Sequence, residues 1–167
     1  MTMKSIYLAS PLGFADSTRP FMEGLARALG EHFTVLNPWD NHEFDRDLKD
    51  ANAEQGEYAR RMALFARFNR HVAQANEEAI RRCDLVVGVL DGIDVDSGTA
   101  SEMGFAYGIG KRVYGLRTDF RLTGDNIAAG VNLQVRHWIE ASGGRYLTSV
   151  DDLRAALTAE SGESRPG

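Results

Sequence analysis

Cysteine is almost absent from this sequence of 167 residues, which has a single one, Cys83. An internal disulfide and a cysteine-rich zinc site are therefore excluded. Long apolar runs are missing as well, since no stretch approaches the roughly 20 residues that cross a bilayer, and we expect no membrane partner. The first four residues run straight into an apolar segment without the layout of a signal peptide, so a reduced, cytoplasmic compartment is expected.

The sequence also lacks an excess of positive charge. It has 24 acidic and 19 basic side chains, which give a formal net charge of −5. Nucleic-acid binders depend on clustered lysine and arginine, so this balance argues against a nucleic-acid partner and favours a small uncharged ligand. We expect no metal and no cofactor. No metal-ligand spacing is found among the four histidines, which are His32, His42, His71 and His137.

The composition is that of an ordinary globular protein, with 43% hydrophobic and 26% charged residues. The length suits a single domain, which we expect over residues 1–160, followed by a disordered tail at 161–167. The polar and acidic segment 41–58 shows little periodicity. It is either an active-site lid or a plain surface excursion.

Short apolar runs alternate with segments of helical periodicity, a pattern typical of βαβ units. It predicts a doubly wound α/β sandwich with a mostly parallel five-stranded sheet, and we favour the flavodoxin-like strand order 2-1-3-4-5. The expected strands are 5–10, 33–37, 85–90, 112–117 and 145–149. The expected helices are 16–30, 59–82, 99–109, 132–141 and 150–159, and the long second one has a break near Asn69 or Asn76 as an alternative.

In this strand order, ligands bind beyond the carboxyl ends of the first and third strands. The residues expected there are 10–14 and 91–102. The second segment carries Asp91, Asp94, Asp96 and Glu102. Carboxylates gathered at a strand end suit metal binding, acid–base catalysis or nucleophilic attack on a sugar carbon. Gly98, in the same loop, permits a close approach of ligand.

Glu102 has two interpretations from the residues alone, and they are about equally supported. Thr99 and Glu102 have the spacing of a capping box, in which both would only satisfy backbone donors at a helix start. Alternatively Glu102 is a functional carboxylate, kept ionised by the partial positive charge of the helix N-terminus. Tyr7, in the first strand, needs a hydrogen-bond partner if it is buried, and Glu102 is one candidate for it.

Several segments together resemble the nucleoside 2-deoxyribosyltransferases, and the resemblance extends from the first strand to the region of Asn132. The acidic loop with its Gly–Thr–x–x–Glu step is the most specific part. The segments that carry the resemblance are Tyr7–Pro11, Cys83–Asp84, Asp94–Ala106, Leu116–Arg121 and Val131–Gln134.

The resemblance implies a two-step exchange of the base of a 2′-deoxynucleoside for a free nucleobase. Glu102 would be the nucleophile that forms a covalent deoxyribosyl intermediate, with retention at C1′. Asp96 would contact the base and assist protonation of the leaving nitrogen, and Tyr7 would orient the nucleophile. Asn132 would come from a neighbouring subunit to the region of the 5′-hydroxyl, and Phe14 would provide a wall for the base.

Other residues complete the predicted site. Asp94 and Gly98, in the acidic loop, are expected to contact the substrate. Asn76 falls where some members carry an aspartate that contributes to base or sugar recognition, which is the main departure from the family pattern. The resemblance further implies a homo-oligomer based on dimers, with a hexamer as one candidate size and with active sites shared between subunits.

Two other functions remain open. Related enzymes hydrolyse nucleoside 5′-monophosphates and hold the phosphate with a Gly- and Arg-containing loop after the first strand. Here that loop, residues 10–15, contains no basic residue, so an uncharged 5′-hydroxyl fits it better than a phosphate does. An N-glycoside hydrolase of nucleosides or their 5′-monophosphates is nevertheless the first alternative. The second is a nucleotide-sensing module without turnover.

Overall fold

The computed structural model describes residues 3–162, and a five-stranded sheet lies at its centre. All neighbouring strands are parallel, and their order is β2-β1-β3-β4-β5. The predicted fold class and strand order are therefore confirmed. The strands are β1 Ser5–Ala9, β2 Thr34–Leu36, β3 Leu85–Val89, β4 Arg112–Leu116 and β5 Tyr146–Leu147.

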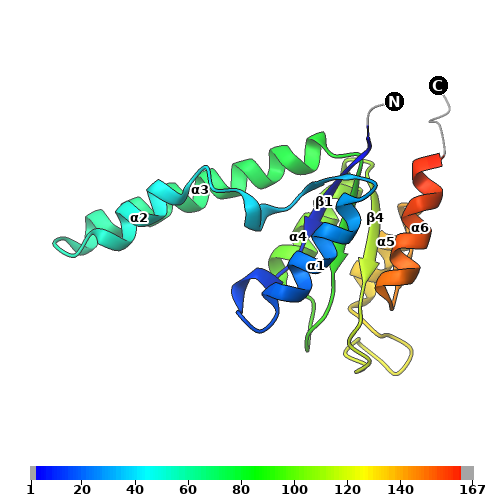
Figure 1. Cartoon of the computed structure of the whole chain (residues 1–167). Helices are drawn as coiled ribbons and strands as arrows, with labels where there is room; N and C mark the ends of the chain where they lie inside the picture. The colour runs from blue at the N-terminus through cyan, green and yellow to red at the C-terminus, as the bar shows by residue number, and fades with distance from the viewer. Residues whose placement is uncertain (1–2, 163–167) are drawn as a thin grey trace.

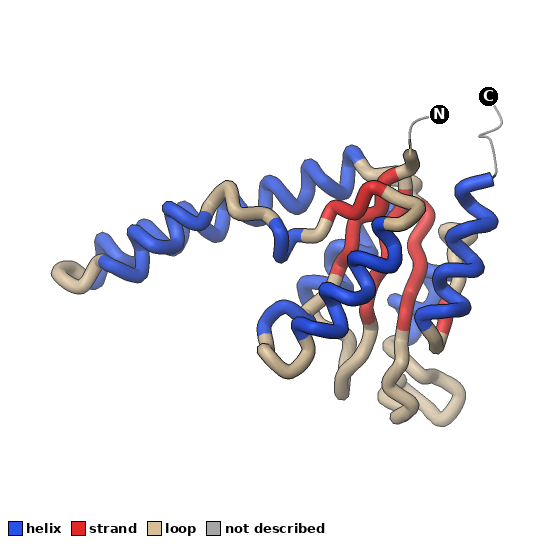
Figure 2. The backbone as a smooth tube through the Cα atoms, viewed as in Figure 1, coloured by secondary structure: helices blue, strands red, loops and turns tan. Residues whose placement is uncertain are grey.

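Helices cover both faces of this sheet (Figures 1 and 2). The α-helices are α1 Arg19–Gly30, α2 Asp45–Ala53, α3 Tyr58–Arg82, α4 Ser97–Gly108, α5 Leu133–Ala141 and α6 Val150–Gly162. Two short 3₁₀ helices, η1 Leu12–Phe14 and η2 Pro38–Asp40, follow β1 and β2. One face of the sheet packs on α1 and α6, and the other packs on α3, α4 and α5.

The alternation of side chains along β1 decides which residue reaches which face. Ile6 and Leu8 pack with α1 and α6, whereas Tyr7 and Ala9 pack with α3, α4 and α5. Tyr7 is 1% exposed and lies in register with Val86 of β3. Its side chain therefore points from the middle of the sheet toward the helices that follow β2 and β3.

The region between β2 and β3 differs from the prediction. The segment 41–58, expected to have little periodicity, contains the helix α2, which packs against α3. Helix α3 is continuous over 25 residues, without a break at Asn69 or Asn76. Figure 1 shows α2 and the outer part of α3 extending beyond the sheet as a helical hairpin, which we call the arm and define as residues 45–70.

The C-terminal ends of α4 and α6 differ in how well they match the prediction. Helix α4 ends as predicted near Gly110, whose φ of 78° lies in the left-handed region. The amides of Gly110 and Lys111 then bond the carbonyls of Tyr107 and Ala106, which is a Schellman motif. Helix α6 continues to Gly162, so residues 161 and 162 are helical rather than part of the predicted tail. The remainder of that tail, residues 163–167, lies outside the described residues.

Within residues 3–162, every helix is too short or too polar to span a membrane.

Candidate active site

A cavity of about 460 Å³ opens at the carboxyl ends of β1 and β3, where the strand order predicts a ligand site. Its volume is within the range of small-molecule pockets. Asn76, Asp96 and Glu102 supply its main polar groups, together with Ser10 and the start of α4. Its apolar lining comes mainly from Phe14, Trp39, Phe68 and Val72.

Glu102 is held by two hydrogen bonds from different elements. The Tyr7 hydroxyl, on β1, donates to its Oε1 atom at 2.7 Å. The Asn76 side-chain amide Nδ2, on α3, donates to the same Oε1 at 3.3 Å. The structure therefore contains the predicted Tyr7–Glu102 pair and adds Asn76 to it. Within residues 3–162, no hydrogen bond is made to the other carboxylate oxygen, Oε2.

The capping-box interpretation of Glu102 is wrong. Helix α4 begins at Ser97, two residues before the predicted start, and its N-cap is Asp96. The Asp96 carboxylate accepts from the Thr99 amide at 2.9 Å and from the Thr99 hydroxyl at 3.2 Å. Glu102 consequently lies in the second turn of α4, where its hydrogen bonds go to Tyr7 and Asn76 rather than to terminal amides.

Burial, and not the helix N-terminus, dominates the electrostatics of Glu102. Burial raises the pKa of this carboxyl, and the negative charge of Asp96 raises it further, while the hydrogen bonds from Tyr7 and Asn76 oppose the increase. The effect of a helix N-terminus fades beyond the first turn, so it does not overcome burial here. The pKa of Tyr7 is raised as well, by burial and then by the charge of Glu102, and the phenol remains a neutral donor.

An aromatic wall stands beside these polar groups. The Trp39 indole Nε1 donates to the Ser10 carbonyl at 2.8 Å, which ties η2 to the end of β1. The Phe14 ring meets the Trp39 ring edge-on, with centroids 4.5 Å apart, and is 78% exposed. A Cβ atom at Gly13 would lie 2.1 Å from the Trp39 ring. The glycine is therefore what allows the indole to occupy its position.

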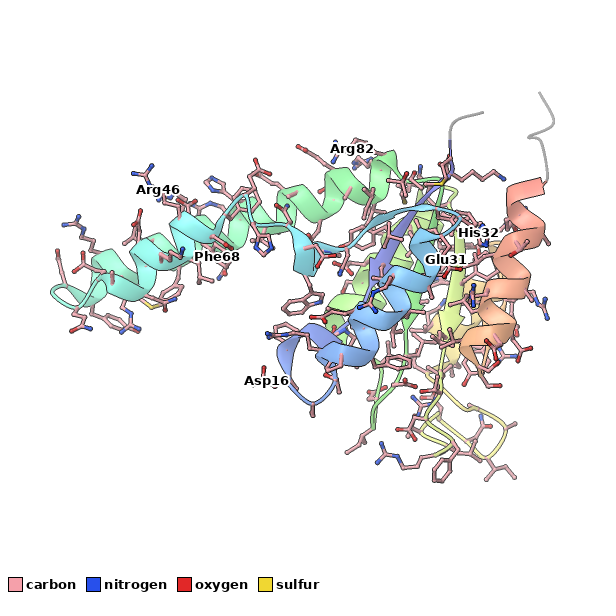
Figure 3. All side chains as sticks on the ribbon, viewed as in Figure 1. Asp16, Glu31, His32, Arg46, Phe68 and Arg82 are labelled. Carbon is pink, nitrogen blue, oxygen red and sulfur yellow. The ribbon has the colours of Figure 1, made fainter. Side chains whose placement is uncertain are left out.

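Four lining residues were not predicted from the sequence, namely Pro38, Trp39, Phe68 and Val72. Pro38 and Trp39 lie in η2, shortly after β2, so the rule that ligands bind at carboxyl strand ends could have included them. Phe68 and Val72 belong to α3, whose outer part forms the arm together with α2. Figure 3 labels one residue on each helix of the arm, Phe68 on α3 and Arg46 on α2. No sequence signal distinguished Phe68 and Val72 from the other apolar residues of α3.

Two predicted site residues lie away from the cavity lining in this chain. Asp94 is exposed, and its carboxylate accepts from the neighbouring Val95 amide at 2.7 Å. Asn132 is the N-cap of α5, and its Oδ1 accepts from the amides of Gln134 and Val135. The remaining predicted residues, Tyr7, Phe14, Asn76, Asp96, Gly98 and Glu102, line the cavity or bond directly to a residue that does.

The site also has a defined set of charges. Its lining contains two carboxylates, those of Asp96 and Glu102, and no lysine or arginine. No group of three or more histidine, cysteine, aspartate or glutamate side chains in residues 3–162 is arranged to hold a metal ion. The arrangement offers a neutral or cationic ligand an apolar wall on one side and a hydrogen-bonded carboxylate on the other.

The chain was compared with protein-family models, curated proteins and solved structures. A family model described as nucleoside 2-deoxyribosyltransferase matches residues 6–134. No curated relative matches the chain. Among solved structures, the chain is similar to a conserved protein from Enterococcus faecalis V583, with a TM-score of 0.66 and 23% identity over 95% of this chain and 99% of that chain.

Two further solved structures share this fold. A 2-deoxyribosyltransferase from the psychrotolerant bacterium Bacillus psychrosaccharolyticus has a TM-score of 0.61 and 23% identity, over 94% of this chain and 95% of that chain. A CMP N-glycosidase from Clostridium botulinum has a TM-score of 0.52 and 18% identity, over 93% of this chain and 99% of that chain. At these identities, the likeness is one of fold.

Proposed function

Because the chain belongs to the nucleoside 2-deoxyribosyltransferase family, we propose that it exchanges the base of 2′-deoxynucleosides through a covalent intermediate on Glu102. The observation that carries the proposal is the position and hydrogen bonding of this carboxylate. It lines the cavity, and it accepts one hydrogen bond from Tyr7 and one from Asn76. A carboxylate used only to cap its own helix would bond the terminal amides instead.

The reaction proceeds in two displacements. In the first, a carboxylate oxygen of Glu102 bonds to C1′ while the bond from C1′ to the base nitrogen breaks. The electron pair of that bond leaves with the base, which takes up a proton with the help of Asp96. In the second, the nitrogen of another base attacks C1′, loses its proton and releases the carboxylate. Two inversions give retention of configuration.

The side chains around the cavity support a nucleoside over a nucleoside 5′-monophosphate. Phosphate sites in proteins rely on arginine, lysine or free helix N-terminal amides. The lining here has no basic side chain, and the N-terminus of α4 is already capped by the Asp96 carboxylate. The aromatic pair Phe14 and Trp39 suits a flat, uncharged base, which would stack on it.

We also propose a cytoplasmic homo-oligomer, based on dimers, in which a neighbouring subunit supplies Asn132. Two observations support shared sites. Asn132 lies outside the cavity lining of its own chain, and the preceding loop exposes large apolar side chains. Phe120 is 94% exposed and Ile127 is 96% exposed, and covering them with a neighbouring subunit would remove apolar surface from water.

The main alternative is hydrolysis, in which water replaces the second base. It has support from the solved structure of the same fold that is a CMP N-glycosidase. A third function is a nucleotide-sensing module, which would bind the ligand without turnover. The three functions differ in what a free base does to the reaction.

The deciding experiment incubates the protein with a 2′-deoxynucleoside, with and without a different free base. A transferase yields the exchanged nucleoside and consumes the donor faster when base is supplied. Equal consumption with and without base, or a strong preference for the 5′-monophosphate, supports the hydrolase, and binding without product supports the sensor. Mass spectrometry should detect a deoxyribosyl adduct on Glu102, and full exchange by Glu102→Ala would refute the mechanism.

A further inference from the structure

The two oxygens of the Glu102 carboxylate are in different environments. Oε1 accepts from Tyr7 at 2.7 Å and from Asn76 at 3.3 Å, whereas Oε2 accepts from no group in residues 3–162. The two donors come from β1 and α3, and both of these elements contact α4. The carboxylate is therefore held through one oxygen, and the lone pairs of the other are left for a ligand.

We propose that Asn76 is a positioning residue, which together with Tyr7 holds Oε1 of Glu102 and leaves Oε2 to bond to C1′. This inference rests on the proposed function and identifies the reacting atom within it. In the first displacement the bond between Oε2 and C1′ forms, the bond between C1′ and the base nitrogen breaks, and its electron pair leaves with the base. Oε1 then becomes the carbonyl oxygen of the ester and keeps both donors.

The chemical nature of Asn76 matters to this role. An amide can give Glu102 a hydrogen bond without adding charge, whereas an aspartate at the same position would bring a second negative charge to within about 3 Å of Oε1. Two carboxylates so close cannot both be ionised easily. The amide thus favours the ionised form of Glu102, which is the form that attacks carbon. Its hydrogen bond works against burial, which raises the pKa of Glu102.

The first test measures the titration of Glu102 directly and does not depend on activity. Glutamate side chains labelled with ¹³C are followed by NMR against pH, and the Glu102 signal is assigned from its loss in Glu102→Gln. We expect the apparent pKa of Glu102 to rise in Asn76→Ala, which loses a hydrogen bond to the ionised form, and to rise further in Asn76→Asp, which adds a negative charge. Asn69→Ala, at an exposed asparagine of the same helix, is the matched control and should leave it unchanged.

The second test separates positioning from direct substrate recognition. If Asn76 acts through Glu102, Asn76→Ala lowers kcat about tenfold to a hundredfold, the effect of one hydrogen bond to a charged group. KM and the ratio of rates for two different bases stay constant. The acid limb of the profile of kcat against pH moves to higher pH, because the pKa of Glu102 is higher in the variant. A higher KM or an altered base preference with an unchanged acid limb shows that Asn76 binds substrate, and it overturns the proposal.

The two tests also separate this inference from the proposed function. An unchanged Glu102 titration in both Asn76 variants overturns the positioning role, whatever the activity. A shifted titration in a protein whose wild type exchanges no base supports the hold on Glu102 and refutes the transferase. Asn76→Asp keeps the size of the side chain, so a variant that folds remains to be measured even if Asn76→Ala does not fold.

Discussion

At Glu102, the needs of folding and of chemistry are opposed. Attack on carbon needs an ionised carboxylate, but burial favours the neutral acid and raises its pKa. The cost is absent below the ordinary pKa of 4.5, where both states are protonated. It accumulates between that value and the raised folded pKa, where the folded state still binds a proton that the unfolded chain has released. Above the folded pKa the cost is complete.

Glu102→Gln is therefore expected to stabilise the protein while it abolishes base exchange. The glutamine imitates the neutral acid, and its side-chain oxygen still accepts from Tyr7 and Asn76. We expect Tm at pH 7 to increase by about 2–4 °C, the change that about 1 kcal/mol produces in a domain of this size. The gain should disappear below pH 4.5.

Thermal unfolding followed by circular dichroism at several pH values measures this effect. Glu23→Gln, at an exposed carboxyl on α1, is the matched control and should leave Tm nearly unchanged. A Glu102→Gln variant with an unchanged or lower Tm at pH 7 would show that ionised Glu102 carries no folding cost.

Gly13 is a second residue where the structure makes a sharp prediction. Its substitution by alanine would set a methyl group 2.1 Å from the Trp39 ring, so the indole must leave its position on the Ser10 carbonyl. We expect Gly13→Ala to raise KM for nucleosides about tenfold or more through the damaged aromatic wall. In a Trp138→Phe background, the fluorescence of Trp39 should shift to longer wavelength.

The matched control for this change is Gly24→Ala, in the middle of α1. A Cβ atom there meets no atom within 4 Å, and alanine favours helix over glycine by about 0.5–1 kcal/mol. Gly24→Ala should therefore keep full activity and increase stability. If Gly13→Ala binds substrate and fluoresces like the wild type, the aromatic wall does not depend on the glycine.

Single residues were predictable from sequence where one rule fixed their surroundings. Tyr7 and Glu102 could be paired because both lie near the switch point of the sheet. The sign of the pKa shift of Glu102 could not be predicted, because it depends on how deeply three separate elements bury the carboxyl. Asn76 could be aligned with the family but not assigned a contact, since the rotation of α3 about its axis follows from packing.

The arm is the element that the sequence described least well. Only Ala51 is buried in α2, so its sequence shows little of the apolar periodicity that predicts a helix. Its stability comes from contact with α3 instead. Asp47 of α2 accepts from Arg67 at 2.8 Å and from His71 at 3.0 Å, and these two bonds join the helices.

The sequence also leaves the continuity of α3 open. The segment is long for one helix of a compact domain, which is why the sequence leaves a break near Asn69 or Asn76 as an alternative. Asn69 is exposed to solvent, and Asn76 directs its amide to Glu102. Neither side chain interrupts the helix, and Val72, which lies between them, lines the cavity.

We expect Asp47→Asn to loosen α2 from α3 without unfolding the sheet. The hydrogen bond from His71 and then the charge of Arg67 lower the pKa of Asp47, so its stabilising effect is complete above the ordinary value of 3.8 and is lost as the pH falls through the lowered one. At pH 7, hydrogen exchange of the amides of residues 45–53 should therefore become severalfold faster in the variant.

Asp50→Asn is the matched control for this prediction, because Asp50 is exposed on the same helix. Its exchange rates should equal those of the wild type. Wild-type exchange should itself accelerate in α2 when the pH is lowered below 3.8, after correction for the intrinsic rate. Unchanged protection of α2 in Asp47→Asn would mean that apolar contacts alone hold the arm.

In the molecule as a whole, the strand order collects the loops after β1, β2, β3 and β4 at one edge of the sheet. Hydrogen bonds between residues far apart in the sequence then tie the loops after β3 and β4 together. The buried Arg117 donates to the Gly92 carbonyl at 3.0 Å, and Asp91 accepts from the Thr118 amide at 2.6 Å. The alternation of elements predicted the edge, but these bonds join side chains to distant loop backbone, for which sequence has no periodic signal.

Assembly is the remaining property of the whole molecule, and Asn132 provides its test. Glu102→Ala should be inactive, and Asn132→Asp should lose most activity while its carboxylate still caps α5. If each site takes Glu102 from one subunit and Asn132 from another, a mixed dimer contains one site with both native residues. Refolding an equal mixture of the two variants should then restore about a quarter of wild-type activity, since half of the dimers are mixed and half of their sites are intact.

Two results would show that Asn132 serves no neighbouring site. One is an activity of the mixture no greater than the sum of the separate variants, and the other is a monomer in sizing experiments at assay concentration. The exposed Phe120 and Ile127 would then need another explanation.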